Sequence, residues 1–241
     1  MSGRPPVDVI ERLLRDRPAF HSQGAARWDC LPGTLAGLRG LLFAGAQSIE
    51  IGCGASTVIF AAAGAYHTVI SPDAEEHRLV AAYCEAIGVR TDRVTFRVGY
   101  SDDILPELCR QRFLDIAFID GAHSFPYPEV DWHYLVKALK VGGTVVLDDI
   151  PIPSVAPLYK LMCTESHWRC DGVFDRRAGA FTLLAAPPGE NWSDQAFNRS
   201  YPDNSFLPLR VRASATLAGQ AERVHAALAR RIGRGRASST A

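Results

Sequence analysis

The sequence has no apolar run long enough to cross a membrane and no Cys-x-x-Cys pair. A membrane-spanning helix needs about 20 consecutive apolar residues, whereas the longest apolar segment, 58–66, is short and contains Gly64. The N-terminal stretch Met-Ser-Gly-Arg-Pro-Pro lacks the apolar core of a signal peptide. The six cysteines do not have the spacing of zinc or redox sites. We therefore expect reduced, buried thiols in a cytoplasmic protein without a membrane partner.

The chain also lacks a net charge, because 26 Lys and Arg balance 26 Asp and Glu over 241 residues. The charges are unevenly distributed: residues 205–241 hold seven Arg and one Glu and carry +6, which leaves −6 on residues 1–204. A composition of 47% hydrophobic and 22% charged residues is that of a globular protein. It excludes a disordered chain and a nucleic-acid coat protein that is basic throughout.

Strand-like and helix-like segments alternate through the middle of the chain. Apolar and β-branched runs predict strands at 46–51, 67–70, 94–98, 114–119 and 144–147. The segments between them predict helices at 56–65, 74–87 and 130–139. A last strand is predicted at 180–185, with 172–174 as its candidate partner. This alternation favours βαβ units and a parallel sheet covered by helices on both faces.

Three segments are predicted along the chain. Residues 1–45 form an N-terminal helical cap, with helices at 7–16 and 35–43, and residues 46–186 form the α/β core. Residues 187–241 form a C-terminal extension, in which apolar residues recur at helical spacing over 217–232 before a disordered end. That amphipathic helix packs either on its own core or on a partner subunit, which leaves a homo-oligomer open.

A glycine-containing turn follows the first predicted strand. It holds four candidate ligand-binding residues, Glu50, Gly52, Gly54 and Ser56. The glycines let the backbone turn tightly and approach a ligand closely, although such a turn can also be purely structural. Asp73 lies 19 residues after Gly54, where nucleotide-binding folds place an acid on ribose hydroxyls. Thr57 departs from the dinucleotide fingerprint, and Glu50 suits a cationic ligand better than a pyrophosphate.

Residues 47–150 resemble the class I S-adenosylmethionine-dependent methyltransferases. The segment 49–54 resembles the first motif of that family, and Asp73 matches its ribose-binding acid. The segment 98–102 resembles the part that lines the adenine pocket through a residue such as Ser101 or Asp102. The resemblance implies S-adenosylmethionine as cofactor and residues 46–186 as the methyltransferase core. It also implies an α/β, Rossmann-like, doubly wound fold: a mostly parallel seven-stranded sheet with helices on both faces and an antiparallel last strand.

Three aspartates follow the two most apolar strands. Asp120 comes directly after 114–119, and Asp148 and Asp149 come after 144–147. Because the ends of neighbouring parallel strands open onto one crevice, we expect these carboxylates to converge, which is unfavourable unless a cation neutralises them. Mg²⁺ or another divalent cation binds such oxygen ligands. In the alternative, one aspartate caps a helix, another pairs with an arginine, and no metal binds.

The segment Asp120-Gly121-Ala122-His123 resembles the Asp-Gly-x-His signature of metal-dependent, small-molecule O-methyltransferases of the macrocin type. The catechol-type enzymes are similar at the aspartates. These resemblances imply that Asp120, Asp148 and Asp149 bind metal and that His123 is the general base, with Asp120 also at the cofactor. Asp120 and His123 are thus the candidate catalytic residues. A hydroxyl that attacks a methyl sulfonium must lose its proton, which a metal and a neutral imidazole both promote.

The sequence therefore predicts an S-adenosylmethionine-dependent methyltransferase that methylates a small-molecule hydroxyl with divalent-metal assistance. Aromatic residues after the signature either wall the substrate pocket or pack the following helix; they are Phe125, Tyr127, Trp132 and Tyr134. One alternative is a nucleic-acid or protein methyltransferase that uses the basic tail, and the acidic body disfavours nucleic acid. The others are a catalytically silent S-adenosylmethionine-binding protein and an NAD-dependent dehydrogenase.

Overall fold

The computed structural model of the protein describes residues 8–21, 30–187, 191, 195–199 and 208–209. The chain divides into two compact units, 1–197 and 198–241, and the whole sheet belongs to the first. The predicted amphipathic helix at 217–232 and the predicted disordered end lie outside the described residues. No helix in the described ranges is long and apolar enough to span a membrane. The predicted three-segment division of the chain stays a prediction.

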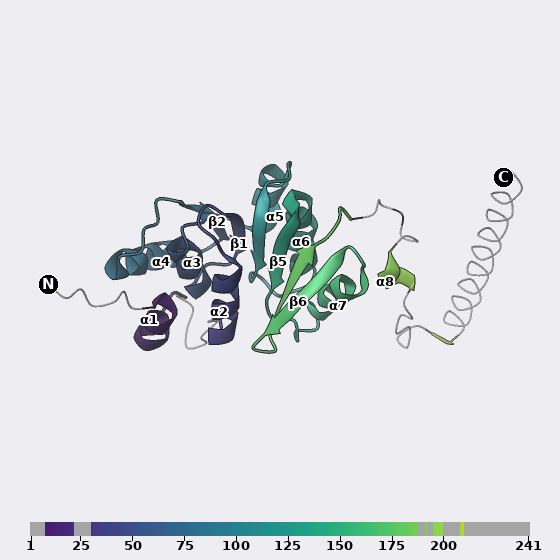
Figure 1. Cartoon of the computed structure of the whole chain (residues 1–241), viewed down its shortest axis with the longest axis horizontal. Helices are drawn as coiled ribbons and strands as arrows, with labels where there is room; N and C mark the ends of the chain where they lie inside the picture. The colour runs from purple at the N-terminus through teal and green to yellow at the C-terminus, as the bar shows by residue number, and fades with distance from the viewer. Residues whose placement is uncertain (1–7, 22–29, 188–190, 192–194, 200–207, 210–241) are drawn as a thin grey trace, which may run out of the picture. The chain divides into compact units, whose positions relative to one another are not determined.

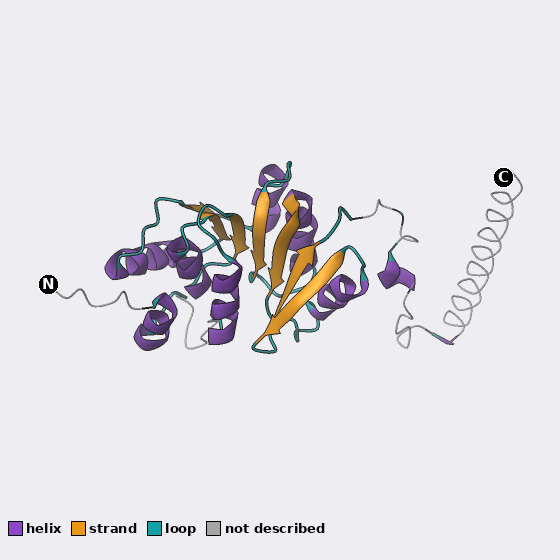
Figure 2. Ribbon diagram, in the orientation of Figure 1, coloured by secondary structure: helices purple, strands orange, loops and turns teal. Residues whose placement is uncertain are grey.

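Seven strands form one sheet in the order β3-β2-β1-β4-β5-β7-β6 (Figure 2). They are β1 (Gln47–Ile51), β2 (Tyr66–Ser71), β3 (Val94–Val98), β4 (Leu114–Ile119), β5 (Leu139–Leu147), β6 (Trp168–Phe174) and β7 (Ala178–Leu183). Strands β1 to β5 pair in parallel, whereas β7 is antiparallel to both β5 and β6. The predicted Rossmann-like, mostly parallel sheet with an antiparallel last strand is confirmed.

Helices cover both faces of the sheet (Figure 1). One face carries α1 (Val9–Asp16), α2 (Pro32–Leu41), α3 (Ala55–Ala62) and α4 (Ala74–Ile87); the other carries α5 (Ser101–Leu108), α6 (Tyr127–Ala138) and α7 (Ala156–Thr164). Alternate residues of β4 feed the two apolar cores, with Ile116 and Phe118 in one and Ala117 and Ile119 in the other. The short α8 (Ala196–Arg199) follows, and the Phe197 amide donates to Glu165 at 2.8 Å.

The described residues include three helices that the sequence patterns do not predict, α5, α7 and the short α8. Pro106 lies inside α5 and Pro157 in the first turn of α7, and proline usually interrupts helical patterns. In α7 the proline is tolerated because first-turn amides have no intrahelical acceptor. The strand β5 begins five residues earlier than predicted, at Leu139.

The strand order reverses between β1 and β4, which fixes where a ligand site can form. The backbone ladders continue one residue beyond the strand ends: the Gly52 amide donates to Ile70, and the Asp120 amide to Ile51. The Asp148 amide likewise donates to Ile119. The loops after β1, β4 and β5 therefore begin side by side at one edge of the sheet. In open α/β sheets, ligands bind at this edge near the point of reversal.

Candidate active site

A cavity of about 500 Å³ lies at the carboxyl ends of β1, β2 and β4. Most of the predicted site residues line it: Gly52, Gly54, Ser56, Asp73, Ser101, Asp120, His123 and Asp149. Glu50, Asp102 and Asp148 are not among its lining residues. The structure thus brings most of the predicted residues to one cavity and leaves Glu50, Asp102 and Asp148 outside its lining.

The turn after β1 needs glycine at Gly52 for two reasons. Its φ of 108° lies in a region that L side chains rarely adopt, and a Cβ there would come 2.4 Å from the Asp120 carbonyl oxygen. Gly54 is different, because its φ of 178° is ordinary extended backbone. A Cβ at Gly54 would lie 3.6 Å from the His21 ring, on the cavity side. Gly52 therefore allows the ends of β1 and β4 to meet, and the missing side chain at Gly54 leaves room in the cavity.

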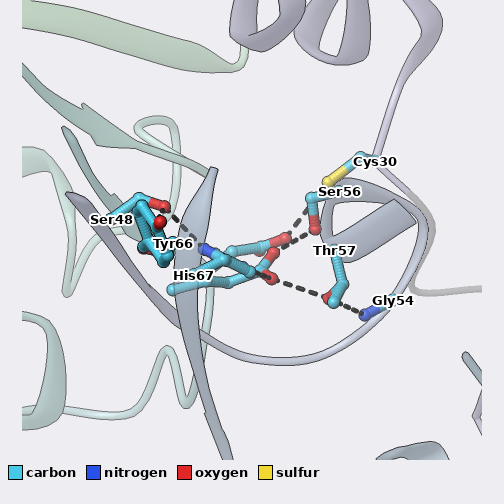
Figure 3. Close-up of polar contacts among 9 residues, drawn as sticks. Cys30, Ser48, Gly54, Ser56, Thr57, Tyr66 and His67 are labelled. Atoms are coloured by element: carbon cyan, nitrogen blue, oxygen red, sulfur yellow. Dashed lines mark hydrogen bonds and ion pairs between the residues drawn. The ribbon is translucent and has the colours of Figure 1, made fainter. Parts of the chain in front are cut away.

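Glu50 is fully buried and stabilises this turn from within the protein. Its carboxylate accepts hydrogen bonds from the hydroxyls of Ser56 and Thr57, and His67 Nε2 lies 3.2 Å from one carboxylate oxygen. The Gly54 amide in turn donates to the Thr57 hydroxyl at 3.1 Å, and Ser48 lies 2.9 Å from the other His67 nitrogen, as Figure 3 shows. The predicted contact between Glu50 and a cationic ligand stays a prediction, because the carboxylate is already engaged in this network.

Two carboxylates stand at the end of β2. Asp73 caps α4, since its side chain accepts the Glu75 amide at 2.8 Å. Glu76, which the sequence analysis missed, accepts the Ser71 hydroxyl at 2.8 Å and lies 2.7 Å from His21 Nδ1. Both acids line the cavity. The spacing could have indicated Glu76, because a residue three positions after an N-cap faces back toward the start of its helix.

The carboxylates after β4 and β5 meet around His123 and Arg177. His123 Nε2 lies 3.5 Å from an Asp149 oxygen and 3.9 Å from an Asp120 oxygen. The Arg177 guanidinium contacts both oxygens of Asp149, at 2.5 and 3.0 Å, and its Nε lies 3.7 Å from Asp148. Arg177 precedes β7, a segment in which the sequence analysis placed no site residue. Only the antiparallel direction of β7 brings it to this edge of the sheet.

Burial controls the protonation of this cluster. It raises the pKa of Asp120 well above the usual value, and the neighbouring Asp148 adds to the effect. Burial also raises the pKa of Asp148, whose two oxygens have no hydrogen-bond partner among the described residues. The Cys30 thiol donates to Asp120 at 3.2 Å, and burial raises the pKa of this thiol, which keeps it protonated. Burial thus favours the neutral, protonated form of Asp120 and Asp148, and a positive group bound beside them would favour their ionised form.

The donor atoms provide a test of whether a divalent metal fits. Within the described residues two groups hold three donor atoms within 4.8 Å of one another: Cys30, Asp120 and Asp148, and Asp120, His123 and Asp149. The predicted trio Asp120, Asp148 and Asp149 is not among these groups. In addition, both Asp149 oxygens are bound by Arg177, so Asp149 could bind a metal only if the guanidinium left. The residues as arranged do not fit the predicted metal site.

The far wall of the cavity carries Ser101 and two tyrosines. Ser101 begins α5 and is buried, whereas the side chain of Asp102 is exposed. Tyr100 and Tyr127 line the cavity, and Tyr100 was not predicted. The other aromatic residues that follow the signature differ in their surroundings. Phe125 is 75% exposed, whereas Trp132 and Tyr134 on α6 pack against the apolar core.

Comparisons with known proteins give a match to one domain family and several structures of similar fold. Residues 49–150 match a family model described as a methyltransferase domain. No curated protein matches the chain. The match begins in β1 and ends just after Asp148 and Asp149, so it includes both strand ends that carry the predicted site but not Arg177.

Several solved structures share the fold. One is an O-methyltransferase from Bacillus cereus in complex with SAH (17% identity, TM-score 0.59, covering 75% of this chain and 93% of that one). Another is the O-methyltransferase TomG from Streptomyces achromogenes, involved in tomaymycin synthesis and bound to SAM (18%, 0.56, 73% and 88%). A methyltransferase from Geobacter sulfurreducens is similar at 17% identity (TM-score 0.53, covering 77% of this chain and 92% of that one). This chain has the fold of these methyltransferases.

Proposed function

We propose that the protein is an S-adenosylmethionine-dependent methyltransferase that methylates the hydroxyl group of a small molecule. The methyltransferase-domain match and the shared fold support the use of S-adenosylmethionine. The observation that carries the hydroxyl assignment is the position of His123, on the loop after β4, where it lines the same cavity as the glycine turn and the acids after β2.

The cofactor half of the cavity has the groups that a nucleoside with a sulfonium requires. Gly52 and Gly54 leave the backbone close to the ligand, and the carboxylates of Asp73 and Glu76 are acceptors for ribose hydroxyls. Asp120 lines the cavity next to the buried Asp148, and a bound sulfonium would favour the ionised form of these two groups, whose pKa burial raises. An NAD-dependent reaction is disfavoured, because a pyrophosphate would add negative charge beside the same aspartates.

The transfer half holds a histidine with two carboxylates near the same ring nitrogen, Nε2. In the proposed reaction the substrate hydroxyl gives its proton to Nε2 of His123 while its oxygen attacks the methyl carbon. The oxygen–carbon bond forms as the carbon–sulfur bond breaks, which releases S-adenosylhomocysteine. The imidazolium that results faces Asp149 and Asp120, which stabilise its charge. His123 Nε2 is buried and has no hydrogen-bond partner among the described residues, so in this reaction the substrate hydroxyl must reach it from the cavity that His123 lines.

The sequence also predicts metal assistance, and no step of this reaction uses it. A divalent cation at this site would act as a Lewis acid on the substrate oxygen. The residues that would hold it are Asp120, His123 and Asp149, and the last is engaged by Arg177.

Binding and turnover test the proposal separately. S-adenosylhomocysteine should raise the melting temperature of the protein, because a ligand that binds the folded state stabilises it by mass action. A panel of small alcohols and phenols, followed by mass spectrometry, should yield a methylated product. His123→Asn should keep the thermal shift and lower kcat about 10²- to 10⁴-fold, the usual contribution of a general base.

His133→Asn is the matched control, because His133 is an exposed histidine on α6 next to Lys137. It should leave both measurements unchanged. Absence of a thermal shift with S-adenosylhomocysteine would contradict the proposed cofactor. Binding without methylation of any hydroxyl would instead favour the catalytically silent alternative, and an unchanged kcat in His123→Asn would remove the base from the mechanism.

A further inference from the structure

We propose that Arg177 is a fixed cation of this site and takes the place of the divalent metal that its carboxylates would otherwise bind. This inference rests on the proposed function, since it concerns the transfer half of the same cavity. It also replaces the metal that the sequence resemblance implies with a residue of the chain itself.

The contacts of Arg177 are those of a bound cation. Its guanidinium meets both oxygens of Asp149 and approaches Asp148, and it lines the cavity. A planar guanidinium matches a carboxylate in this two-point geometry better than any other side chain. Both donor atoms that Asp149 would offer to a metal are therefore occupied by nitrogen donors.

The backbone fixes Arg177 in this position. Its carbonyl accepts the Ile150 amide at 2.9 Å, which ties the start of β7 to the loop after β5. Its own amide donates to the Phe174 carbonyl at 2.9 Å across the turn between β6 and β7. That turn is anchored in addition by Asp175, which accepts the Thr34 amide of α2 at 2.8 Å. Hydrogen bonds thus hold in place the backbone of the hairpin that carries the guanidinium.

The electrostatics favour Arg177 over an added metal. Burial alone would lower the pKa of Arg177, but Asp149, Asp148 and Asp120 outweigh it and raise the pKa, so the guanidinium stays charged. A divalent cation on Asp149 would have to displace this charge or lie beside it, and like charges at that distance repel. The Arg177 guanidinium is the positive charge that offsets the repulsion among the three adjacent aspartates.

Arg177 acts on the reaction through Asp149. Asp149 has a φ of 54°, and its Oδ2 atom both accepts a hydrogen bond from Arg177 and lies 3.5 Å from His123 Nε2. Arg177 is therefore a positioning residue that fixes the carboxylate next to the base.

Manganese binding to the full-length protein tests this inference without relying on turnover. The loss of the free Mn²⁺ electron paramagnetic resonance signal reports bound ion. The wild type should bind no stoichiometric Mn²⁺ at concentrations up to about 1 mM, with or without S-adenosylhomocysteine. Arg177→Met, which removes the charge, should bind about one equivalent, because Asp120, His123 and Asp149 are then free to coordinate it.

Arg176→Met is the matched control, since Arg176 is exposed in the same turn, and it should behave as the wild type. Arg177→Gln replaces Arg177→Met if circular dichroism shows that the latter does not fold. Stoichiometric Mn²⁺ binding by the wild type would overturn the inference, and so would absence of binding in a folded variant without Arg177. Titration with S-adenosylhomocysteine in the same samples distinguishes the two proposals. If S-adenosylhomocysteine does not bind, the proposed function fails, whereas the Mn²⁺ result still decides the role of Arg177.

Discussion

At the scale of single residues, charges around the cavity are held by specific neighbours. Glu50 is engaged by Ser56 and Thr57, and Glu76 by Ser71. Each carboxylate is thereby fixed in direction, which lowers the entropic cost of ordering it around a ligand. Glu76, which lines the cavity together with Asp73, is therefore a second candidate for an acid that binds the ribose.

Glu76 should contribute more to cofactor affinity than Asp73. Contacts from Ser71 and His21 to both oxygens fix the direction of the Glu76 carboxylate beside the cavity, whereas an Asp73 oxygen accepts the Glu75 amide at the start of α4. Glu76→Gln should weaken S-adenosylhomocysteine binding about tenfold, the value of one hydrogen bond to a charged group. Asp73→Asn should weaken it less, and the exposed Glu85→Gln should have no effect. Isothermal titration calorimetry measures all three, and a larger loss in Asp73→Asn would restore the acid predicted from the sequence.

Asp131 should make stability depend on pH. Burial raises its pKa from 3.8 to about 6, an effect that the nearby Ser101 reduces. Between these values the folded chain holds more protons than the unfolded chain, so this residue lowers stability as pH rises from about 4 to 6. Asp131→Asn should therefore raise the free energy of unfolding by about 3 kcal/mol at pH 7.5 and leave it unchanged near pH 4.

Urea denaturation at both pH values checks this, with the exposed Asp103→Asn as control. An equal loss of stability in Asp131→Asn at both pH values would mean that the carboxylate is not destabilised by burial.

At the scale of elements, the strand ends and the turns that follow them place the chemistry. The predicted strands 94–98 and 114–119 and the helix 74–87 match the observed bounds, because their β-branched, apolar and glycine-terminated patterns are local. Local patterns could not predict Arg177, which reaches Asp149 through the reversed pairing of β5 and β7. Glu50 lies where predicted, but only the fold shows His67 and Thr57 on its carboxylate.

Gly52→Ala tests the meeting of β1 and β4. The new Cβ would lie 2.4 Å from the Asp120 carbonyl oxygen, and φ is 108°, so the turn must open. We expect a loss of about 2 kcal/mol or more in the free energy of unfolding and no measurable binding of S-adenosylhomocysteine. Gly40→Ala in α2 is the control, because a Cβ there meets nothing within 4 Å and alanine favours a helix by about 0.5–1 kcal/mol. Thermal unfolding of both variants checks this, and equal melting temperatures would contradict the expected loss of stability in Gly52→Ala.

At the scale of the whole molecule, the sheet, both apolar cores and the cavity belong to the unit 1–197. The excess of positive charge in the sequence lies in 205–241, where seven Arg accompany one Glu. This positive charge therefore belongs to a different part of the sequence from the residues that line the cavity.

A chain that ends at residue 199 should keep the folded core, including the Phe197 contact with Glu165. Its melting temperature should lie within about 3 °C of the full chain, and its affinity for S-adenosylhomocysteine within about twofold. Neither form should bind duplex DNA or RNA at physiological salt, since the body carries net negative charge. Calorimetry and filter binding measure these quantities. RNA binding by the full chain alone, with methylated RNA as product, would support the nucleic-acid alternative instead.

The antiparallel direction of β7 brings a residue from outside the matched domain into the same cavity as residues of that domain. The methyltransferase-domain match ends at residue 150, yet the hairpin between β6 and β7 adds Arg177 to the same cavity. Mutations in this hairpin can change the charge of the transfer half while the shared domain, its glycine turn and its aspartates stay intact. It follows from the proposal for Arg177 that the domain match, which ends before the hairpin, does not by itself indicate whether this chain uses a metal.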